Sequence, residues 1–125
     1  MILGTGIDII EVERVQAAYT RFGGRFTERI LHPSELAYCL SHTAPGPFLA
    51  ARFAGKEAIS KAFGTGIGAH LGWQDMEIRR TESGQPSVVF HGKGRTLLAG
   101  RGGRVVHLSL SHTAKHATAL AILES

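Results

Sequence analysis

The stretch PFLAARFAGKEAISKAFGTG, residues 47–66, decides how the chain folds. It is rich in alanine over most of its length, and Gly64 stands where a glycine commonly ends a helix. Glu57 and Lys61 are four residues apart, the spacing that brings two side chains to one face of a helix. The stretch therefore predicts a long helix from Pro47 to Phe63, followed by a loop rich in glycine.

The sequence on both sides of this helix predicts strands and shorter helices. Isoleucine and leucine dominate residues 2–10, which favours a buried first strand. A strand, then helices, then further strands indicates the α+β class, with a mainly antiparallel sheet packed against the long helix. The other strands are expected at residues 73–80, 87–91, 105–111 and 117–123, and shorter helices at residues 11–19, 33–40 and 93–99.

Size and composition exclude several classes of protein. A chain of 125 residues predicts a single domain, 1–125. No apolar run approaches the roughly 20 residues of a membrane span, so we expect no membrane partner. One cysteine, Cys39, excludes an internal disulfide framework. The first residues do not resemble a signal peptide, and the default expectation is a cytoplasmic protein.

Two carboxylates stand out because their neighbours in sequence are mostly apolar. Asp8 lies in the first predicted strand, on the same face as Gly4 and Gly6, and Glu57 lies in the middle of the long helix. If the helix packs on the strand, the two carboxylates meet, and oxygen ligands of this kind suit Mg²⁺. In the alternative, Glu57 pairs with Lys61 on a solvated face and Asp8 caps the next helix. Spacing alone favours this alternative.

A second pattern joins two lysines to the glycine-rich loop. Lys56 and Lys61 precede Gly64, Thr65 and Gly66. Lysines beside backbone N–H groups can hold phosphates. The ordinary alternative is a helix end at which lysine complements the helix dipole.

A third pattern lies near the end of the strand predicted at residues 105–111. Ser109 and Ser111 share one face of this strand, and His112 follows them. Hydroxyl and imidazole groups in this arrangement can bind phosphate oxygens, whereas a solvated strand face is the common alternative. No serine-nucleophile elbow of the G-x-S-x-G type is present.

The basic charge of the chain points to an anionic partner. The formal net charge is +4, and arginines recur along the first predicted helix and the residues after it. They can dock an acidic helix or a nucleic-acid backbone, or simply keep the surface soluble. The main alternative to an enzyme is therefore a basic module that binds nucleic acid or nucleotides. The arginines concerned are Arg14, Arg21, Arg25 and Arg29.

Four motifs stand in order along the chain: Gly6-Ile7-Asp8-Ile9, the run from Arg52 to Gly66, Gly84-Gln85-Pro86, and Ser109-Leu110-Ser111-His112-Thr113. Together they resemble holo-[acyl-carrier-protein] synthase, the small single-domain branch of the 4′-phosphopantetheinyl transferases. The resemblance covers essentially the whole chain, and the helix motif is its most specific part.

The resemblance implies the fold of that family and its reaction. Coenzyme A would donate its 4′-phosphopantetheine arm to a serine of apo acyl carrier protein, which leaves adenosine 3′,5′-bisphosphate. Mg²⁺ would be required. The reaction would serve fatty acid biosynthesis in the cytoplasm, and no nucleic-acid partner is implied.

The resemblance also implies roles for individual residues. The catalytic set would be Asp8, Glu57 and Lys61, with Asp8 and Glu57 holding the metal. The coenzyme A phosphates would be contacted by Lys56, Lys61 and His112. The cleft would be shaped by Gly64, Thr65, Gly66 and Pro86, with Ser111 and Thr113 beside His112. The acidic carrier protein would dock on Arg14, Arg21, Arg25 and Arg29.

The family is usually a homotrimer with its active sites between subunits, and the resemblance implies the same assembly here. One departure concerns the loop before the long helix, which is often basic in relatives. Here it reads Ser41-His42-Thr43-Ala44-Pro45-Gly46. A phosphate contact from this loop would therefore be missing or be supplied by His42.

Overall fold

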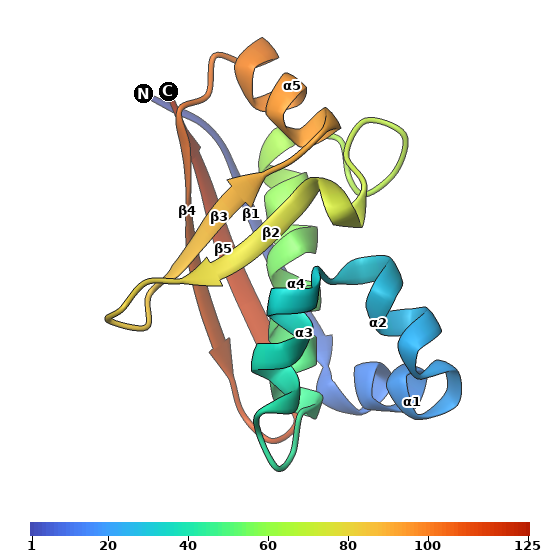
Figure 1. The fold of residues 1–125 in the computed structure, drawn as a ribbon. Helices are drawn as coiled ribbons and strands as arrows, with labels where there is room; N and C mark the ends of the chain where they lie inside the picture. The colour runs from blue at the N-terminus through green and yellow to red at the C-terminus, as the bar shows by residue number, and fades with distance from the viewer.

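A computed structural model describes all residues, 1–125, as five strands, five α-helices and one short 3₁₀ helix (Figure 1). This arrangement confirms the α+β class. None of the helices is both long enough and apolar enough to cross a membrane. In chain order the elements are β1 (Ile2–Glu11), α1 (Val12–Phe22), α2 (Gly24–Ile30), α3 (Pro33–Leu40), α4 (Gly46–Phe63), η1 (Trp73–Asp75), β2 (Met76–Arg80), β3 (Pro86–Phe90), α5 (Lys93–Gly100), β4 (Val105–His112) and β5 (His116–Glu124).

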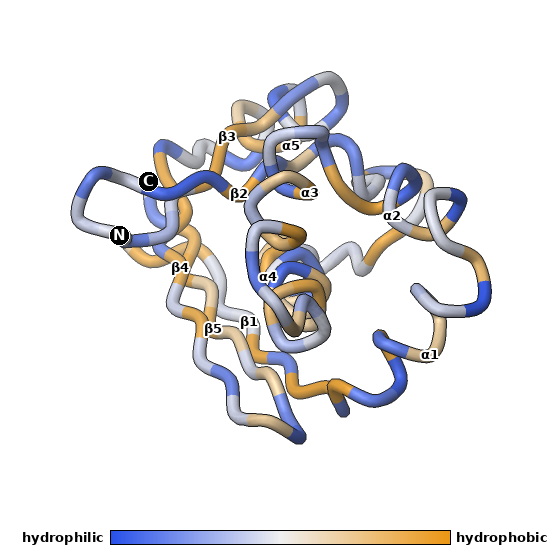
Figure 2. Tube along the Cα trace, turned by 60° about the horizontal axis from the view of Figure 1, so that its bottom comes forward, coloured by the Kyte–Doolittle hydropathy of each residue, from blue (hydrophilic) through white to orange (hydrophobic).

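Two antiparallel sheets surround the long helix. β1, β5 and β4 form one sheet in that order, and β2 pairs with β3 in a hairpin. Figure 2 shows α4 nearly end-on in the middle of the molecule, between the three-stranded sheet and helices α1 to α3. The prediction of a mainly antiparallel sheet packed against the long helix is therefore confirmed.

Small side chains allow α4 to be buried on most of its surface. Ala54 and Ala58 are fully buried between α4 and the strands, and Phe63 closes the core at the end of the helix. The helix ends at Gly64, whose φ of 77° is left-handed, the conformation that glycine adopts at least cost. A helix buried on so many sides is the central support of the fold.

Two glycines let β1 approach the backbone of α4 unusually closely. A Cβ atom on Gly6 would lie 1.9 Å from the carbonyl oxygen of Ala58, and one on Gly4 would lie 2.0 Å from that of Ala62. No side chain fits at these positions, because both obstacles are backbone atoms. Asp8 lies on the same face of β1 as these glycines, so this close packing brings its carboxylate to α4.

The outer face of β1 is exposed, which corrects the expectation of a buried first strand. Ile2, Ile7 and Ile9 have exposed fractions of 60%, 66% and 69%. Side chains alternate between the two faces of a strand, so the face with Gly4, Gly6 and Asp8 packs on α4, and Ile7 and Ile9 point away. Ile2 lies beyond the register shift between Ile2 and Gly4, near the start of the strand. No element of the chain covers the three isoleucines.

A fully buried ion pair joins α4 to α3. The ammonium of Lys56 lies 2.9 Å from Glu35 Oε1 and also donates to the carbonyl oxygens of Ile30 and Trp73. The second Glu35 oxygen accepts the N–H of Ile78 at 2.9 Å. Burial lowers the pKa of Lys56, and Glu35 acts against that shift. Every charged atom has partners, as a buried pair requires.

Two helical segments were not predicted: α2, and the 3₁₀ helix η1, which occupies the first three residues of the strand expected at residues 73–80. α2 follows α1 almost directly, because the turn at Gly23 ends α1 and Gly24 already belongs to α2. From the sequence, the two glycines were interpreted as a break between elements. In the structure, Phe26 and Ile30 form the apolar side of α2, which packs toward α4 and η1.

Candidate active site

Three side chains meet where β1 crosses α4. Lys61 Nζ donates to Asp8 Oδ1 at 3.1 Å and to the carbonyl oxygen of Ile7 at 3.0 Å. Glu57 precedes Lys61 by four residues, or about 40° around the helix, and so faces the same side of α4. The helix therefore does bring Glu57 to Asp8. Asp8, and not Glu57, is the ion-pair partner of Lys61.

Electrostatics link the two carboxylates. Burial raises the pKa of Glu57, the negative charge of Asp8 raises it further, and Lys61 lowers it. Asp8 is mostly buried, with 17% of its side chain exposed. Two carboxylates beside one ammonium leave an excess of negative charge in partly desolvated surroundings. Oxygen donors of this kind fit Mg²⁺.

The glycine-rich loop does not form the phosphate cradle that its sequence suggested. The N–H groups of Thr65 and Gly66 donate to the carbonyl oxygen of Ser60 at 3.2 and 3.3 Å, and that of Gly64 donates to Lys61. These donors close the last turn of α4. The loop places Gly64, Thr65 and Gly66 next to Lys61, where they can shape a cleft. Their backbone N–H groups are already hydrogen-bonded and do not point to a ligand.

Lys56 is placed differently from its expected role. The sequence groups it with Lys61 as a contact for coenzyme A phosphates, but its side chain has 0% exposure and its ammonium is held by Glu35. Adjacent helical residues point about 100° apart, so Lys56 faces α3 while Glu57 faces β1. We assign Lys56 a structural role.

A second set of side chains surrounds a small cavity of about 150 Å³ on another side of α4. Pro86 of the hairpin and His112 at the end of β4 both line it, as the sequence interpretation expects of residues in one cleft. The ring of His112 packs edge-on against Phe48, with ring centres 4.8 Å apart. Phe48 in turn stacks on His42, at 3.5 Å between centres, so His42 of the non-basic loop lies beside this cavity.

Two arginines in the cavity wall were missed by the sequence interpretation. The guanidinium carbons of Arg52 and Arg80 lie 4.5 and 4.6 Å from the centre of the Tyr38 ring. Arg52 is buried, and its Nε has no hydrogen-bond partner. Burial lowers the pKa of Arg52, the charges of Cys39, Glu35 and Tyr38 act against that shift, and Arg80 adds to it least. Two cations and an unsatisfied buried donor are suited to an anionic ligand.

Leu110 lines the cavity together with His112, but the hydroxyl residues of the serine–histidine motif, Ser109, Ser111 and Thr113, do not. Leu110 and His112 share one face of β4, so Ser111 points to the exposed outer face of the sheet. The hydroxyl of Thr113 accepts the N–H groups of Lys115 and His116, and so it closes the turn between β4 and β5.

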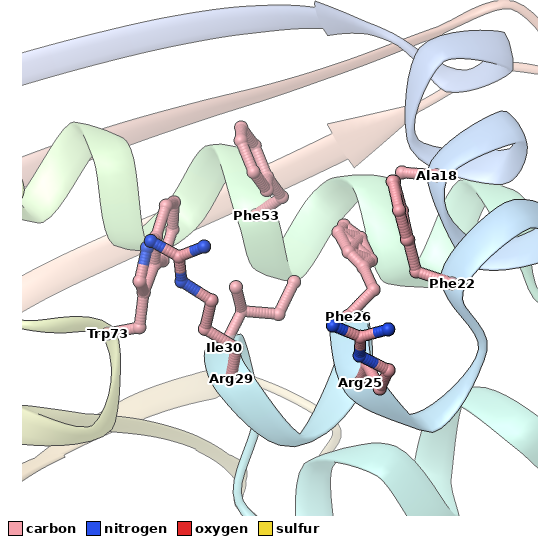
Figure 3. Close-up of a pocket in the computed structure, with 8 residues that line it drawn as sticks. All are labelled: Ala18, Phe22, Arg25, Phe26, Arg29, Ile30, Phe53 and Trp73. Carbon is pink, nitrogen blue, oxygen red and sulfur yellow. The ribbon is translucent and has the colours of Figure 1, made fainter.

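A groove of about 470 Å³ separates the α1–α2 pair from α4 and η1 (Figure 3). Phe22, Phe26, Phe53 and Trp73 supply most of its apolar wall, and the rings of Phe53 and Trp73 are 4.9 Å apart. Figure 3 shows two arginines from α2 along its rim. Of the four predicted docking arginines, Arg25 and Arg29 line the groove, whereas Arg14 and Arg21 are exposed on α1.

The chain is similar to known proteins over nearly its whole length. The family model of the 4′-phosphopantetheinyl transferase superfamily matches residues 4–120. A holo-[acyl-carrier-protein] synthase of Koribacter versatilis is 51% identical over 124 residues, which covers 99% of each chain.

Solved structures give the same result. The crystal structure of holo-[acyl-carrier-protein] synthase from Neisseria meningitidis superposes with a TM-score of 0.92 at 34% identity over 100% of both chains. The enzyme from Bacillus anthracis, solved in complex with CoA (3′,5′-ADP), has a TM-score of 0.84 at 38% identity, over 100% of this chain and 98% of its own. The chain therefore belongs to the 4′-phosphopantetheinyl transferase superfamily, among its holo-[acyl-carrier-protein] synthases.

Proposed function

We propose that the protein transfers 4′-phosphopantetheine from coenzyme A to a serine of apo acyl carrier protein, with Mg²⁺, and so serves fatty acid biosynthesis in the cytoplasm. The observation that carries the proposal is the meeting of Asp8, Glu57 and Lys61 at the crossing of β1 and α4. Paired carboxylates with an adjacent ammonium are suited to a metal-assisted phosphoryl transfer.

The cluster consists of two proposed metal ligands and one lysine proposed to contact phosphate. Asp8 and Glu57 would hold Mg²⁺, which would neutralise charge on the pyrophosphate of coenzyme A. Lys61 lies 3.1 Å from Asp8, half-exposed, and its ammonium can reach a phosphate oxygen bound next to the metal site. The serine hydroxyl of the carrier protein would give its proton to a nearby carboxylate or water, and its oxygen would form a new bond to the β-phosphorus while the bond from this phosphorus to the bridging oxygen breaks. The bridging oxygen leaves with adenosine 3′,5′-bisphosphate.

The small cavity would hold the adenosine bisphosphate end of coenzyme A. Arg52 and Arg80 supply two positive charges there, and Arg52 still has a buried N–H to donate. His112 adds an imidazole at the mouth. An anionic ligand would relieve the repulsion between the two guanidinium groups and satisfy the free donor.

The position of these two sites supports the expected homotrimer with active sites between subunits. Arg52 and Glu57 are five residues apart in α4, about 140° around the helix, so in one chain the two sites face different sides. Ile7 pairs with Leu120 on the outer face of the sheet, and both are exposed. An apolar face of this kind suits burial against another copy, which can bring the cavity of one subunit to the carboxylates of the next.

The groove between the α1–α2 pair and α4 would dock the acyl carrier protein. Its apolar floor and its rim of Arg25 and Arg29 suit an amphipathic helix with acidic residues. Replacing Arg25 and Arg29 by glutamate should raise the KM for carrier protein and leave the KM for coenzyme A unchanged. Arg95→Glu, on the distant helix α5, is the matched control. An unchanged carrier KM in the double variant would remove the groove from the docking surface.

Mass spectrometry tests the transfer itself. The protein is incubated with coenzyme A, Mg²⁺ and apo carrier protein, and the mass of the carrier protein is then measured to detect the addition of one phosphopantetheine group. Asp8→Asn and Glu57→Gln should abolish this addition while the variants keep the thermal transition of the wild type. Glu82→Gln, at the exposed tip of the hairpin, should transfer normally. Full turnover by both site variants would refute the metal-binding roles.

A further inference from the structure

Two histidines and a glutamate converge on the side of α4 that faces α3, away from β1. His32 immediately precedes α3, Glu77 lies in β2, and His91 follows β3. One ligand atom from each of the three lies within 4.8 Å of the other two. Figure 1 shows the elements concerned in front of α4, whereas β1 passes behind it. None of the three residues takes part in the transfer proposed above.

Hydrogen bonds hold the three side chains of this cluster, but they leave the imidazole rings room to rotate. His91 Nε2 donates to Glu77 Oε1 at 2.8 Å, and His32 Nε2 donates to the carbonyl oxygen of Gln74 at 2.9 Å. The two imidazole rings face each other with centres 4.7 Å apart. Glu77 is buried, but 40% of the His91 side chain is exposed. The imidazoles can therefore rotate while the carboxylate stays fixed.

Glu77 is ionised over the whole physiological range. Hydrogen bonds from Arg79, and more weakly from His91 and Ser34, lower its pKa to about 2. Arg79 Nε and Ser34 Oγ both donate to Oε2 at 2.9 Å. Arg79 Nη2 reaches Oε1 only at 3.2 Å, so Oε1 is the oxygen that is more easily freed. A fixed, charged oxygen close to two imidazoles offers the ligand types of a zinc site.

We propose that His32, Glu77 and His91 bind a divalent transition-metal ion of the zinc class. Two nitrogen ligands and one carboxylate oxygen make the three-ligand set that leaves a fourth position for water. Imidazole ligands select zinc-like ions over Mg²⁺, which prefers oxygen alone. Metal–ligand bonds of about 2.0 Å require ligand atoms about 3.3 Å apart, so rotation of the imidazoles must close the cluster by at most about 1.5 Å.

Binding replaces the hydrogen bond from His91 to Glu77 Oε1 and displaces the longer one from Arg79 Nη2 to the same oxygen. The hydrogen that His91 Nε2 gives to Glu77 moves to Nδ1, and the ion takes its place between Nε2 and Oε1. Arg79 and Ser34 remain on Oε2 as outer partners, which orient the carboxylate. The ion would link the β2–β3 hairpin to the start of α3. Without it, these two parts of the chain are joined by hydrogen bonds and packing.

Metal titration of the purified protein tests this site. Zn²⁺ is titrated by calorimetry in excess Mg²⁺, which keeps the Asp8–Glu57 cluster occupied, and Co²⁺ is added separately to record its visible absorption. We expect one tight site with a four-coordinate Co²⁺ spectrum and a Zn²⁺-dependent rise of the Tm. His32→Ala and His91→Ala should each weaken Zn²⁺ binding at least ~100-fold, because loss of even an outer partner commonly costs 10–100-fold.

The chain offers a matched control. His107 also donates to a glutamate, Glu124, at 2.9 Å, but no third ligand lies beside them. His107→Ala should therefore leave Zn²⁺ binding and the Co²⁺ spectrum unchanged, and all three variants should keep the phosphopantetheine transfer. Wild-type Zn²⁺ affinity in both His32→Ala and His91→Ala, or no tight site in the wild type, would overturn the proposal.

Discussion

Replacing Gly6 by alanine should damage stability and catalysis together. The new Cβ would lie 1.9 Å from the carbonyl oxygen of Ala58, whereas real Cβ contacts are essentially never shorter than 3.0 Å. β1 must therefore move away from α4 by about 1 Å. Overpacking of a core costs typically 1–3 kcal/mol, and we expect about 3 kcal/mol here because the obstacle is a backbone carbonyl that no side-chain rotation can move aside. For a domain of this size that lowers the Tm by roughly 10 °C or more.

The same displacement carries Asp8 away from Glu57. A misplacement of about 1 Å at a reacting centre can cost ~100-fold in rate, so kcat/KM should fall by about that factor in the carrier-protein transfer assay. Ala58→Gly should give no rescue, because the obstacle is a carbonyl oxygen and not the alanine side chain.

The matched control for this prediction is Gly68→Ala. Nothing lies within 4 Å of a Cβ at Gly68, and its φ is not positive. The control should therefore keep the Tm and turnover of the wild type. A Gly6→Ala protein with an unchanged Tm and unchanged turnover would refute the close-packing explanation of the site.

Three further predictions concern buried ionisable groups. Lys56→Met leaves the Glu35 carboxylate buried without its cation and should cost about 3–5 kcal/mol in urea unfolding, with partial recovery in Lys56→Met/Glu35→Leu; equal stability of both variants would contradict the buried pair. Glu77 has its pKa lowered to about 2, chiefly by Arg79, so its contribution to stability is present above pH 4.5 and is lost as the pH falls toward 2. In EDTA, Glu77→Gln should therefore be less stable than the wild type at pH 7, and the difference should shrink at about pH 3; a constant difference would argue against an ionised Glu77. Burial raises the pKa of the Cys39 thiol to about 11, so a disulfide reagent at about pH 8 should label this residue only after denaturant is added, and rapid labelling of the folded protein would show that the thiol is accessible.

Much of the fold could be predicted from local patterns. The α4 prediction held because alanine-rich sequence, helical spacing and Gly64 all indicate one structure. The bounds of α3 were predicted fully, from Pro33 at its first position to Leu40. α2 was missed because two successive glycines resemble a linker, although only Gly23 forms the turn.

The site could be predicted only in part, since sequence gives spacing but not direction. Asp8 and Glu57 were paired through the assumption that α4 packs on β1, which the glycines of β1 make possible. Lys56 was misplaced because a helix that is buried on several sides gives no hint of which lysine faces inward. The Arg52–Tyr38–Arg80 stack joins three separate elements, and no local pattern reveals such an arrangement.

The packing of α4 also determines where the protein tolerates the insertion or deletion of residues. Each residue turns the helix by about 100°, so deleting one residue between Arg52 and Lys61 would rotate the later side chains by that angle relative to the earlier ones. Arg52 and Lys56 are aimed at α3, whereas Glu57 and Lys61 are aimed at β1. A single-residue deletion there would change the angle between the proposed nucleotide cavity and the proposed metal ligands. Residues 82 and 83 at the hairpin tip are exposed and do not line the cavity, so insertions between them should be accepted.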